Sequence, residues 1–127
     1  MDPAPRRTAL LLIAHGSRRP DANADLDHVV GQLRARGRFP VVEASFLELA
    51  EPTVEQGAAR CVEQGAGRIV LLPYFLSAGV HVRRDLAALQ EMLSRHYPDV
   101  EVRLAEPLGR HPLLAEVVAQ RADEADR

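Results

Sequence analysis

Two histidines and one glutamate, each just beyond a short apolar run, are the residues with which this sequence can do chemistry. They are His15, Glu48 and His81. Imidazole nitrogens and carboxylate oxygens bind first-row divalent metals such as cobalt, iron, nickel and zinc. Three protein ligands leave coordination positions open, which a metal site that performs a reaction requires. Singly, each residue is more typical of a hydrogen-bonded loop or a solvated surface, so the prediction depends on whether the fold brings them together.

The segments between these residues alternate between strand-like and helix-like patterns. Apolar runs typical of buried strands occupy residues 8–14, 41–47 and 68–76, and a more polar run occupies 100–104. Apolar residues at helical spacing predict helices over 21–36, from Pro52 to Gly65, within 79–97 and over 112–127, the last of them amphipathic. Pro73 is expected either to end regular pairing in the third strand or to sit where no donor is needed, because proline has no N–H to donate.

This order predicts an α/β fold with a four-stranded parallel sheet and helices on both faces. We expect right-handed crossovers and the strand order 2-1-3-4. In such a sheet the chain changes direction between strands one and three, and ligands bind in the crevice outside their carboxyl ends. His15 and His81 flank that crevice and Glu48 lies at the same edge, so we expect the three side chains to converge.

Length and composition fit a single domain over residues 8–127, with residues 1–7 as a flexible leader. Hydrophobic residues make up 46% of the chain and charged residues 27%, and the formal net charge is −2. Such a balance gives no reason to expect nucleic acid or an anionic membrane as a partner. The single cysteine, Cys61, suits a reducing compartment, and the longest apolar run is too short to span a bilayer. We therefore expect a cytoplasmic protein.

Four strings of residues resemble the short-form sirohydrochlorin chelatases. This family belongs to the class II chelatases, which need no ATP and are similar in fold to protoporphyrin ferrochelatase. The strings are LLIAHGSR, VEASFLELAEPTVEQG, IVLLPYFLSAGVHVRRDL and AEPLGRHPLL. The resemblance extends over residues 10–114. Its specificity lies in the combination of HGS after the first strand, FLE closing the second and GxHxxxD after the third.

The resemblance implies that the protein inserts a divalent metal (cobalt, iron or nickel) into sirohydrochlorin or a related tetrapyrrole. His15, Glu48 and His81 match the motif positions that hold or deliver the metal and help to take protons from the macrocycle. The sequence has no Gly-rich phosphate loop, which agrees with a reaction that needs no nucleotide. Longer family members carry two such domains in one chain, and the short form is associated with homodimers, so a homodimer is implied here.

Metal insertion displaces two pyrrole protons, so a base must accept them. Glu48 ends the second strand, to one side of the crevice that the two histidines flank. We therefore expect Glu48 to act as a proton acceptor more than as a metal ligand, with the role of third ligand as the alternative.

Residues next to both histidines are candidates for binding the carboxylates of the macrocycle. They are Ser17, Arg18, Arg19, Arg83 and Arg84. Guanidinium groups bind carboxylates in a bidentate geometry, although solvated arginines fit the pattern nearly as well. Ser17 fits a helix cap equally well. Asp85, four residues after His81, either orients that histidine or favours the dipole of its helix.

Two other functions fit parts of the sequence. A non-catalytic carrier of metal or tetrapyrrole would use the same ligands. A histidine phosphatase is suggested by the similarity of AHGSR to its RHG motif, but Ala14 stands where that motif has arginine. The residues are compatible with biosynthesis of cobalamin, of sirohaem and of a nickel tetrapyrrole.

Overall fold

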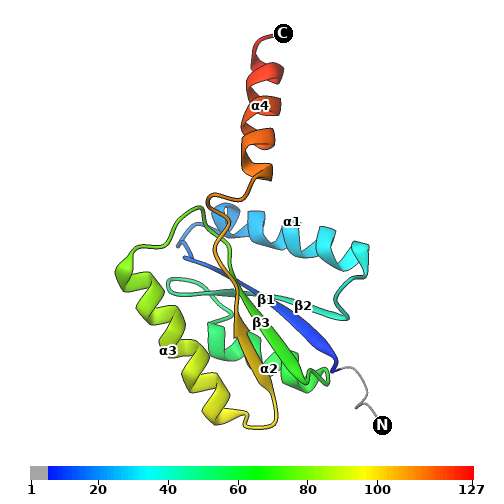
Figure 1. Ribbon diagram of the computed structural model, residues 1–127, viewed down its shortest axis with the longest axis vertical. Coiled ribbons are helices and arrows are strands. Elements are labelled where there is room, and N and C mark those ends of the chain that lie inside the picture. The colour runs from blue at the N-terminus through cyan, green and yellow to red at the C-terminus, as the bar shows by residue number, and fades with distance from the viewer. Residues whose placement is uncertain (1–5) are drawn as a thin grey trace.

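The computed structural model describes residues 6–127, in which strands and helices alternate along the whole chain (Figure 1). The strands are β1 (Thr8–Ala14), β2 (Val41–Phe46), β3 (Arg68–Pro73) and β4 (Glu101–Leu104). The helices are α1 (Pro20–Arg36), α2 (Val54–Glu63), α3 (Val80–His96) and α4 (Leu113–Ala125). All neighbouring strands are parallel, in the order β2-β1-β3-β4. The predicted fold class and strand order are therefore confirmed.

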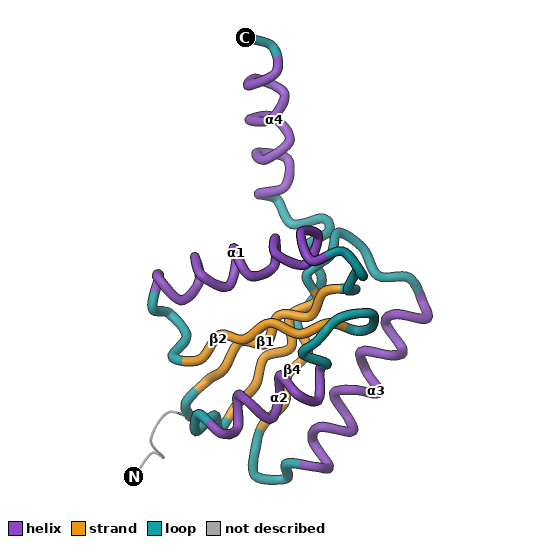
Figure 2. Tube along the Cα trace, turned by 180° about the vertical axis from the view of Figure 1, so that it is seen from behind, coloured by secondary structure: helices purple, strands orange, loops and turns teal. Residues whose placement is uncertain are grey.

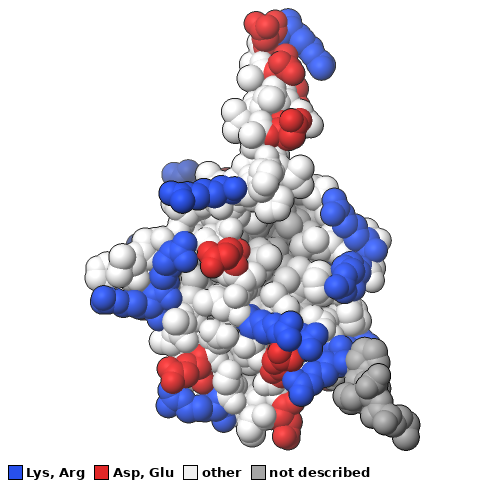
Figure 3. Space-filling model, in the orientation of Figure 1, with Lys and Arg blue, Asp and Glu red and all other residues white. Residues whose placement is uncertain are grey.

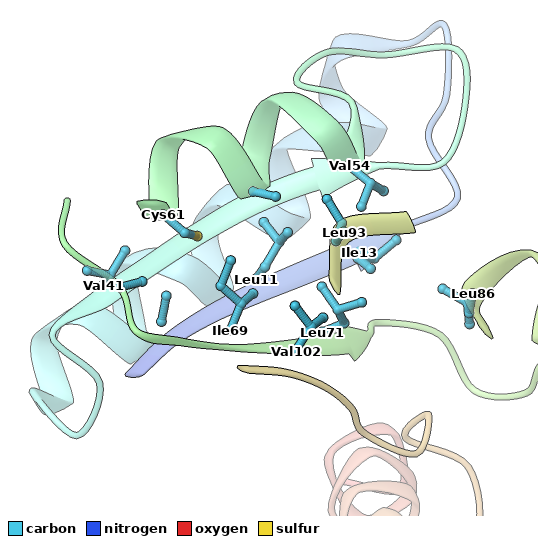
Figure 4. Close-up of a cluster of buried hydrophobic side chains, with 13 residues drawn as sticks. Leu11, Ile13, Val41, Val54, Cys61, Ile69, Leu71, Leu86, Leu93 and Val102 are labelled. Atoms are coloured by element: carbon cyan, nitrogen blue, oxygen red, sulfur yellow. The ribbon is translucent and has the colours of Figure 1, made fainter. Parts of the chain in front are cut away.

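The central strand β1 is buried on both faces, and its side chains alternate between two cores. Leu11 and Ile13 face the core formed with α2 and α3, which Figure 4 shows in close-up. Leu10 and Leu12 face the opposite core, formed with α1. Figure 2 shows α1 on one side of the sheet and α2 with α3 on the other. This double burial explains the unbroken apolar run from which the strand was predicted.

Local sequence signals set the ends of several elements. Thr53 and Gln56 form a capping box at the start of α2, in which each side chain accepts a hydrogen bond from the other's backbone N–H, at 3.2 and 2.8 Å. Pro73 is the last residue of β3, as predicted. Residues 74–76, which the apolar run had assigned to this strand, lie beyond it, and the last bond to β1 is that of the Tyr74 N–H to the Ile13 carbonyl oxygen at 2.7 Å.

The last helix, α4, covers neither face of the sheet, and the two faces are covered by α1 and by α2 with α3. No residue of α4 is buried. Figure 1 shows this helix standing away from the rest of the molecule. No helix among residues 6–127 is long and apolar enough to cross a membrane.

Two residues of the predicted leader are bonded to the domain. The Arg6 guanidinium lies 3.0 Å from a carboxylate oxygen of Glu101, and the Arg7 side chain donates to the Gln64 carbonyl oxygen at 3.1 Å. Hydrogen bonds from Arg68, and next from Arg103, hold the pKa of Glu101 below its usual value. The rest of the leader, residues 1–5, lies outside the described residues.

We expect Cys61 to contribute a pH dependence to stability. Burial, with a smaller effect from Glu43, raises the pKa of the Cys61 thiol to about 12, whereas an unfolded thiol titrates near 8.5. Between these values the native state holds a proton that the unfolded state has lost, so stability falls as pH rises through this window, by at most about 1.4 kcal/mol per pH unit. Urea unfolding from pH 8 to 10 should therefore show a steeper loss for the wild type than for Cys61→Ala. Equal slopes would contradict this account.

Candidate functional site

Backbone hydrogen bonds hold the loops after β1 and β2 side by side. The Leu47 N–H donates to the Ala14 carbonyl oxygen at 2.9 Å, and the Glu48 N–H donates to the His15 carbonyl oxygen at 3.0 Å. These bonds continue the parallel pairing of the two strands past their carboxyl ends. His15 and Glu48, far apart in the sequence, are thereby placed next to each other at the edge of the sheet.

Gly16 permits this close approach. Its φ is 97°, in the left-handed region, and a Cβ at this position would overlap the carbonyl oxygen of Glu48. Glycine adopts this conformation readily, and every other residue meets a steric penalty there. The glycine of the HGS motif is therefore required by the backbone contact between the two loops.

Asn23, in the first turn of α1, holds the remainder of the His15 loop. Its side-chain oxygen accepts from the Ser17 N–H at 3.0 Å, and its side-chain nitrogen donates to the Ser17 carbonyl oxygen at 2.8 Å. The Ser17 hydroxyl accepts from the Arg19 N–H at 3.1 Å, while Arg19 itself is the N-cap of α1. Ser17 therefore shapes the turn and is not the helix cap. Sequence reasoning missed Asn23, although asparagine near a turn often bonds to nearby backbone.

A cavity of about 520 Å³ opens beside His15 and Glu48. Its other lining residues are Leu47, Val82, Asp85, Ala88, Leu89 and Met92. All of these except Leu47 come from one face of α3, where residues three and four apart are neighbours. The cavity therefore has a polar end formed by His15 and Glu48, and a wall on α3 that is apolar apart from Asp85.

Two aspects of this cavity were not predicted. The His15 ring stacks on Phe75, with centroids 4.5 Å apart and an interplanar angle of 29°, so an aromatic neighbour orients the imidazole. The apolar wall on α3 is the second. Its helical spacing is visible in the sequence, but which side of α3 meets the loop after β2 is decided by the tertiary structure.

His81 is exposed at the second position of α3 and does not line the cavity. Residues 6–127 contain no group of three or more His, Cys, Asp and Glu side chains arranged to hold a metal ion. The structure thus brings together two of the three predicted residues, His15 and Glu48. Residues 74–79 separate β3 from α3, so the position of His81 is set by the helix and not by the strand pairing that aligns the other two.

The predicted carboxylate-binding arginines divide into two groups. Arg83 donates to the Ala78 carbonyl oxygen at 3.2 Å and lies 3.5 Å from a carboxylate oxygen of Glu106. Its guanidinium group is therefore already bound to groups of the same chain. Arg18, Arg19 and Arg84 are exposed and form no ion pair within residues 6–127. The second group is thus free to meet an anionic ligand.

The CbiX family model matches residues 9–125 of this chain. The chain belongs to the CbiX family. It is 35% identical to the chloroplastic sirohydrochlorin ferrochelatase of Arabidopsis thaliana, over 88% of this chain and 50% of that one. It is 34% identical to the sirohydrochlorin cobaltochelatase of Methanopyrus kandleri, over 92% and 96%. The structure of SirB from Bacillus subtilis with Fe³⁺ matches it with a TM-score of 0.84 and 32% identity, over 94% and 47%.

The chain spans about half the length of the Arabidopsis and Bacillus proteins and nearly all of the Methanopyrus protein. The CbiX match includes the positions of His15, Glu48 and His81. The family resemblance inferred from the four motif strings is therefore confirmed.

For this CbiX-family chain we expect Gly16→Ala to lower the free energy of unfolding by about 2 kcal/mol, because the new Cβ meets both an unfavourable φ and the Glu48 carbonyl oxygen. Gly31→Ala is the matched control, since Gly31 lies within α1 with no atom within 4 Å of an added Cβ. That change should stabilise the protein by about 0.5–1 kcal/mol. Urea unfolding measures both, and a Gly16→Ala protein as stable as wild type would refute the required close approach.

Proposed function

We propose that this chain inserts a divalent metal, cobalt, iron or nickel, into sirohydrochlorin or a related tetrapyrrole. The observation that carries this proposal is the pairing of His15 with Glu48 at the polar end of an otherwise apolar cavity. Relatives named sirohydrochlorin cobaltochelatase and ferrochelatase support the same reaction. The overall change is balanced by the release of two pyrrole protons for each divalent metal ion that enters the ring.

The metal is a substrate in this proposal, so it must be held loosely enough to leave. Neutral imidazole binds cobalt, iron and nickel, and a site of two imidazoles leaves coordination positions for water and for the macrocycle. His15 supplies one nitrogen from a ring oriented by Phe75. His81 supplies the second from the first turn of α3, at the same edge of the sheet.

The cavity wall on α3 receives one face of the macrocycle. A tetrapyrrole ring has apolar faces and, in sirohydrochlorin, a periphery rich in carboxylates. Val82, Leu89 and Met92 present apolar atoms to the ring face, where contact removes apolar surface from water. The exposed Arg18, Arg19 and Arg84 bind peripheral carboxylates at the rim.

Glu48 is the proton acceptor, because it lies at the polar end of the cavity where the ring nitrogens meet the metal. Asp85 lines the same cavity from α3 and provides a second carboxylate for the second proton. A carboxylate within hydrogen-bond reach of the proton it takes is the requirement for such a base. The chain functions as a homodimer, since one wall cannot enclose a flat macrocycle from both faces.

Multiple turnovers in a purified assay with sirohydrochlorin and cobalt, iron and nickel in parallel test this function. A carrier would form at most one equivalent of product per site, and a phosphatase would leave sirohydrochlorin unchanged. We expect His15→Ala and His81→Ala each to lower the insertion rate at least about a hundredfold while circular dichroism stays unchanged, because both residues are exposed. A near wild-type rate in either variant would remove that histidine from the metal site.

We expect Glu48→Gln to lower the insertion rate at saturating metal by about 10²–10⁴-fold, the usual contribution of a positioned general base. Glutamine keeps the shape and hydrogen-bonding capacity of the side chain but is not a base. Metal affinity should change less, because a loss confined to the rate marks an interaction made mainly in the transition state. Titration of metal against initial rate decides the outcome. Full recovery at high metal would show that Glu48 is a third ligand.

A further inference from the structure

A second cavity, of about 600 Å³, lies at the carboxyl edge of the sheet, between the segment after β3 and the link from β4 to α4. We call it the link cavity. Its polar lining residues are Ser77, Arg83, Glu106 and Arg110. None of them lines the cavity beside His15 and Glu48. The string AEPLGRHPLL forms one side of the link cavity, and the proposed function assigns no role to that string.

Backbone contacts hold the two sides of the link cavity together. The Leu108 N–H donates to the Phe75 carbonyl oxygen at 3.1 Å. Gly109 lies so close to Leu76 that a Cβ would overlap the Leu76 carbonyl oxygen. The next residue, Arg110, has φ of 66°, in the left-handed region that residues other than glycine adopt at a cost. Arg110 is therefore held at the cavity by a backbone that is tied to the segment after β3.

The charges around the link cavity do not balance. Arg83 and Arg110 bring two positive charges, and Glu106 brings the one negative charge among the lining residues. A carboxylate oxygen of Glu106 lies 3.5 Å from the Arg83 guanidinium, and both side chains are more than half exposed. Arg110 forms no ion pair within residues 6–127. Near the foot of α4, where the link lies, Figure 3 shows acidic surface flanked by basic side chains.

The contact between Arg83 and Glu106 shows what kind of group the link cavity accepts. The Arg83 Nε donates to the Ala78 carbonyl oxygen at 3.2 Å, which orients the guanidinium and leaves its terminal nitrogens for a carboxylate. An ion pair as exposed as this one contributes little to stability, so another carboxylate can replace Glu106 at little cost. The unpaired Arg110 then adds a second cation for the incoming group.

We propose that the link cavity binds a peripheral carboxylate of the tetrapyrrole between Arg83 and Arg110, and that Glu106 occupies Arg83 until the substrate displaces it. This inference rests on the proposed function and adds a specificity-determining subsite to it. Guanidinium groups bind carboxylates in a bidentate geometry, which fixes the orientation of the substrate as well as its charge. Glu106 thereby acts as an internal competitor of the substrate.

The position of the link cavity fits this role. Leu76 lines it and follows Phe75, whose ring stacks on His15. Arg83 lies two residues after His81 in the first turns of α3. The link cavity is therefore next to the two histidines proposed to hold the metal. A macrocycle with its centre at those histidines extends over the segment after β3, so that a carboxylate on its periphery meets the two arginines.

Titration with metal-free sirohydrochlorin, followed by the absorbance of the macrocycle, measures its Kd without metal insertion. We expect Arg110→Asn to raise the Kd about tenfold, because a charge-assisted hydrogen bond is lost. Asparagine tolerates the left-handed conformation, so the link should keep its shape. We expect Glu106→Gln to lower the Kd about threefold, since the competing carboxylate is removed from an exposed ion pair. A purely structural role of that ion pair would give no gain in affinity.

Two matched controls make the same changes of charge at the opposite edge of the sheet, where α1 and α2 end. They are Arg36→Asn and Glu63→Gln, both at exposed positions, and neither should change the Kd. Circular dichroism verifies that all four variants fold. In the insertion assay, Arg110→Asn should raise KM for the macrocycle and leave kcat within about twofold, because this contact is the same in the ground and transition states.

An unchanged Kd for Arg110→Asn, or a Kd for Glu106→Gln at or above that of the wild type, would overturn this inference and leave the proposed metal insertion standing. A wild type that does not bind the macrocycle would overturn both. Inorganic phosphate is the probe for a site that takes small anions. If phosphate raises the Tm of Glu106→Gln while its Kd for the macrocycle equals that of the wild type, the link cavity binds inorganic anions and the proposal is wrong.

Discussion

The burial of β1 on both faces is the constraint on which the rest of this structure depends. Side chains along a strand alternate between faces, so a shift of one residue in pairing would exchange the two cores. Leu10 and Leu12 fit against α1, and Leu11 and Ile13 fit against α2 and α3. With both faces occupied, β1 has one register against β2 and one against β3. This register also positions the residues that directly follow the ends of the strands.

The candidate site is a direct extension of that alignment. The pairing of β1 with β2 continues through the His15 carbonyl oxygen and the Glu48 N–H, and Gly16 makes room for the approach. Apolar burial in the core and the placement of an imidazole beside a carboxylate thus have a common cause. A site at the end of a rigid, buried ladder needs few interactions of its own to keep its geometry, which is how a small domain can hold functional groups in place.

The two amphipathic helices after β3 show how the same pattern serves different purposes. On α3, Leu86 and Leu93 are buried in the core, while Val82, Leu89 and Met92 are half-buried and also line the cavity. On α4 no residue is buried, and Leu113, Val117 and Val118 are each more than half exposed. Helical periodicity predicts an apolar face, but it does not say whether that face meets a sheet, a ligand or another molecule. The Methanopyrus protein extends over about one length of this chain and the Arabidopsis protein over about two.

Strand order and most element boundaries could be predicted from the sequence because they depend on local patterns and on the handedness of crossovers. Unbroken apolar runs marked β1 and β3, and Pro73 ended β3. The helix predicted to open at Pro52 begins two residues later, at Val54. The motifs around His15, Glu48 and His81 together also identified the family. A rare combination of motifs carries more information than any one of them alone.

The detail of the site was decided by tertiary structure. The sequence alone placed His15, Glu48 and His81 at one edge of a parallel sheet, since the carboxyl ends of parallel strands lie together. Only the folded chain determined that strand pairing joins His15 to Glu48, that α3 brings Asp85 into the same cavity, and that His81 stands outside it. Likewise, the sequence determined that α4 is amphipathic, and only the folded chain shows that this helix stands away from the domain. The physical reason is that periodicity reports which side of an element is apolar, whereas its direction in space is set by contacts between segments far apart in the chain.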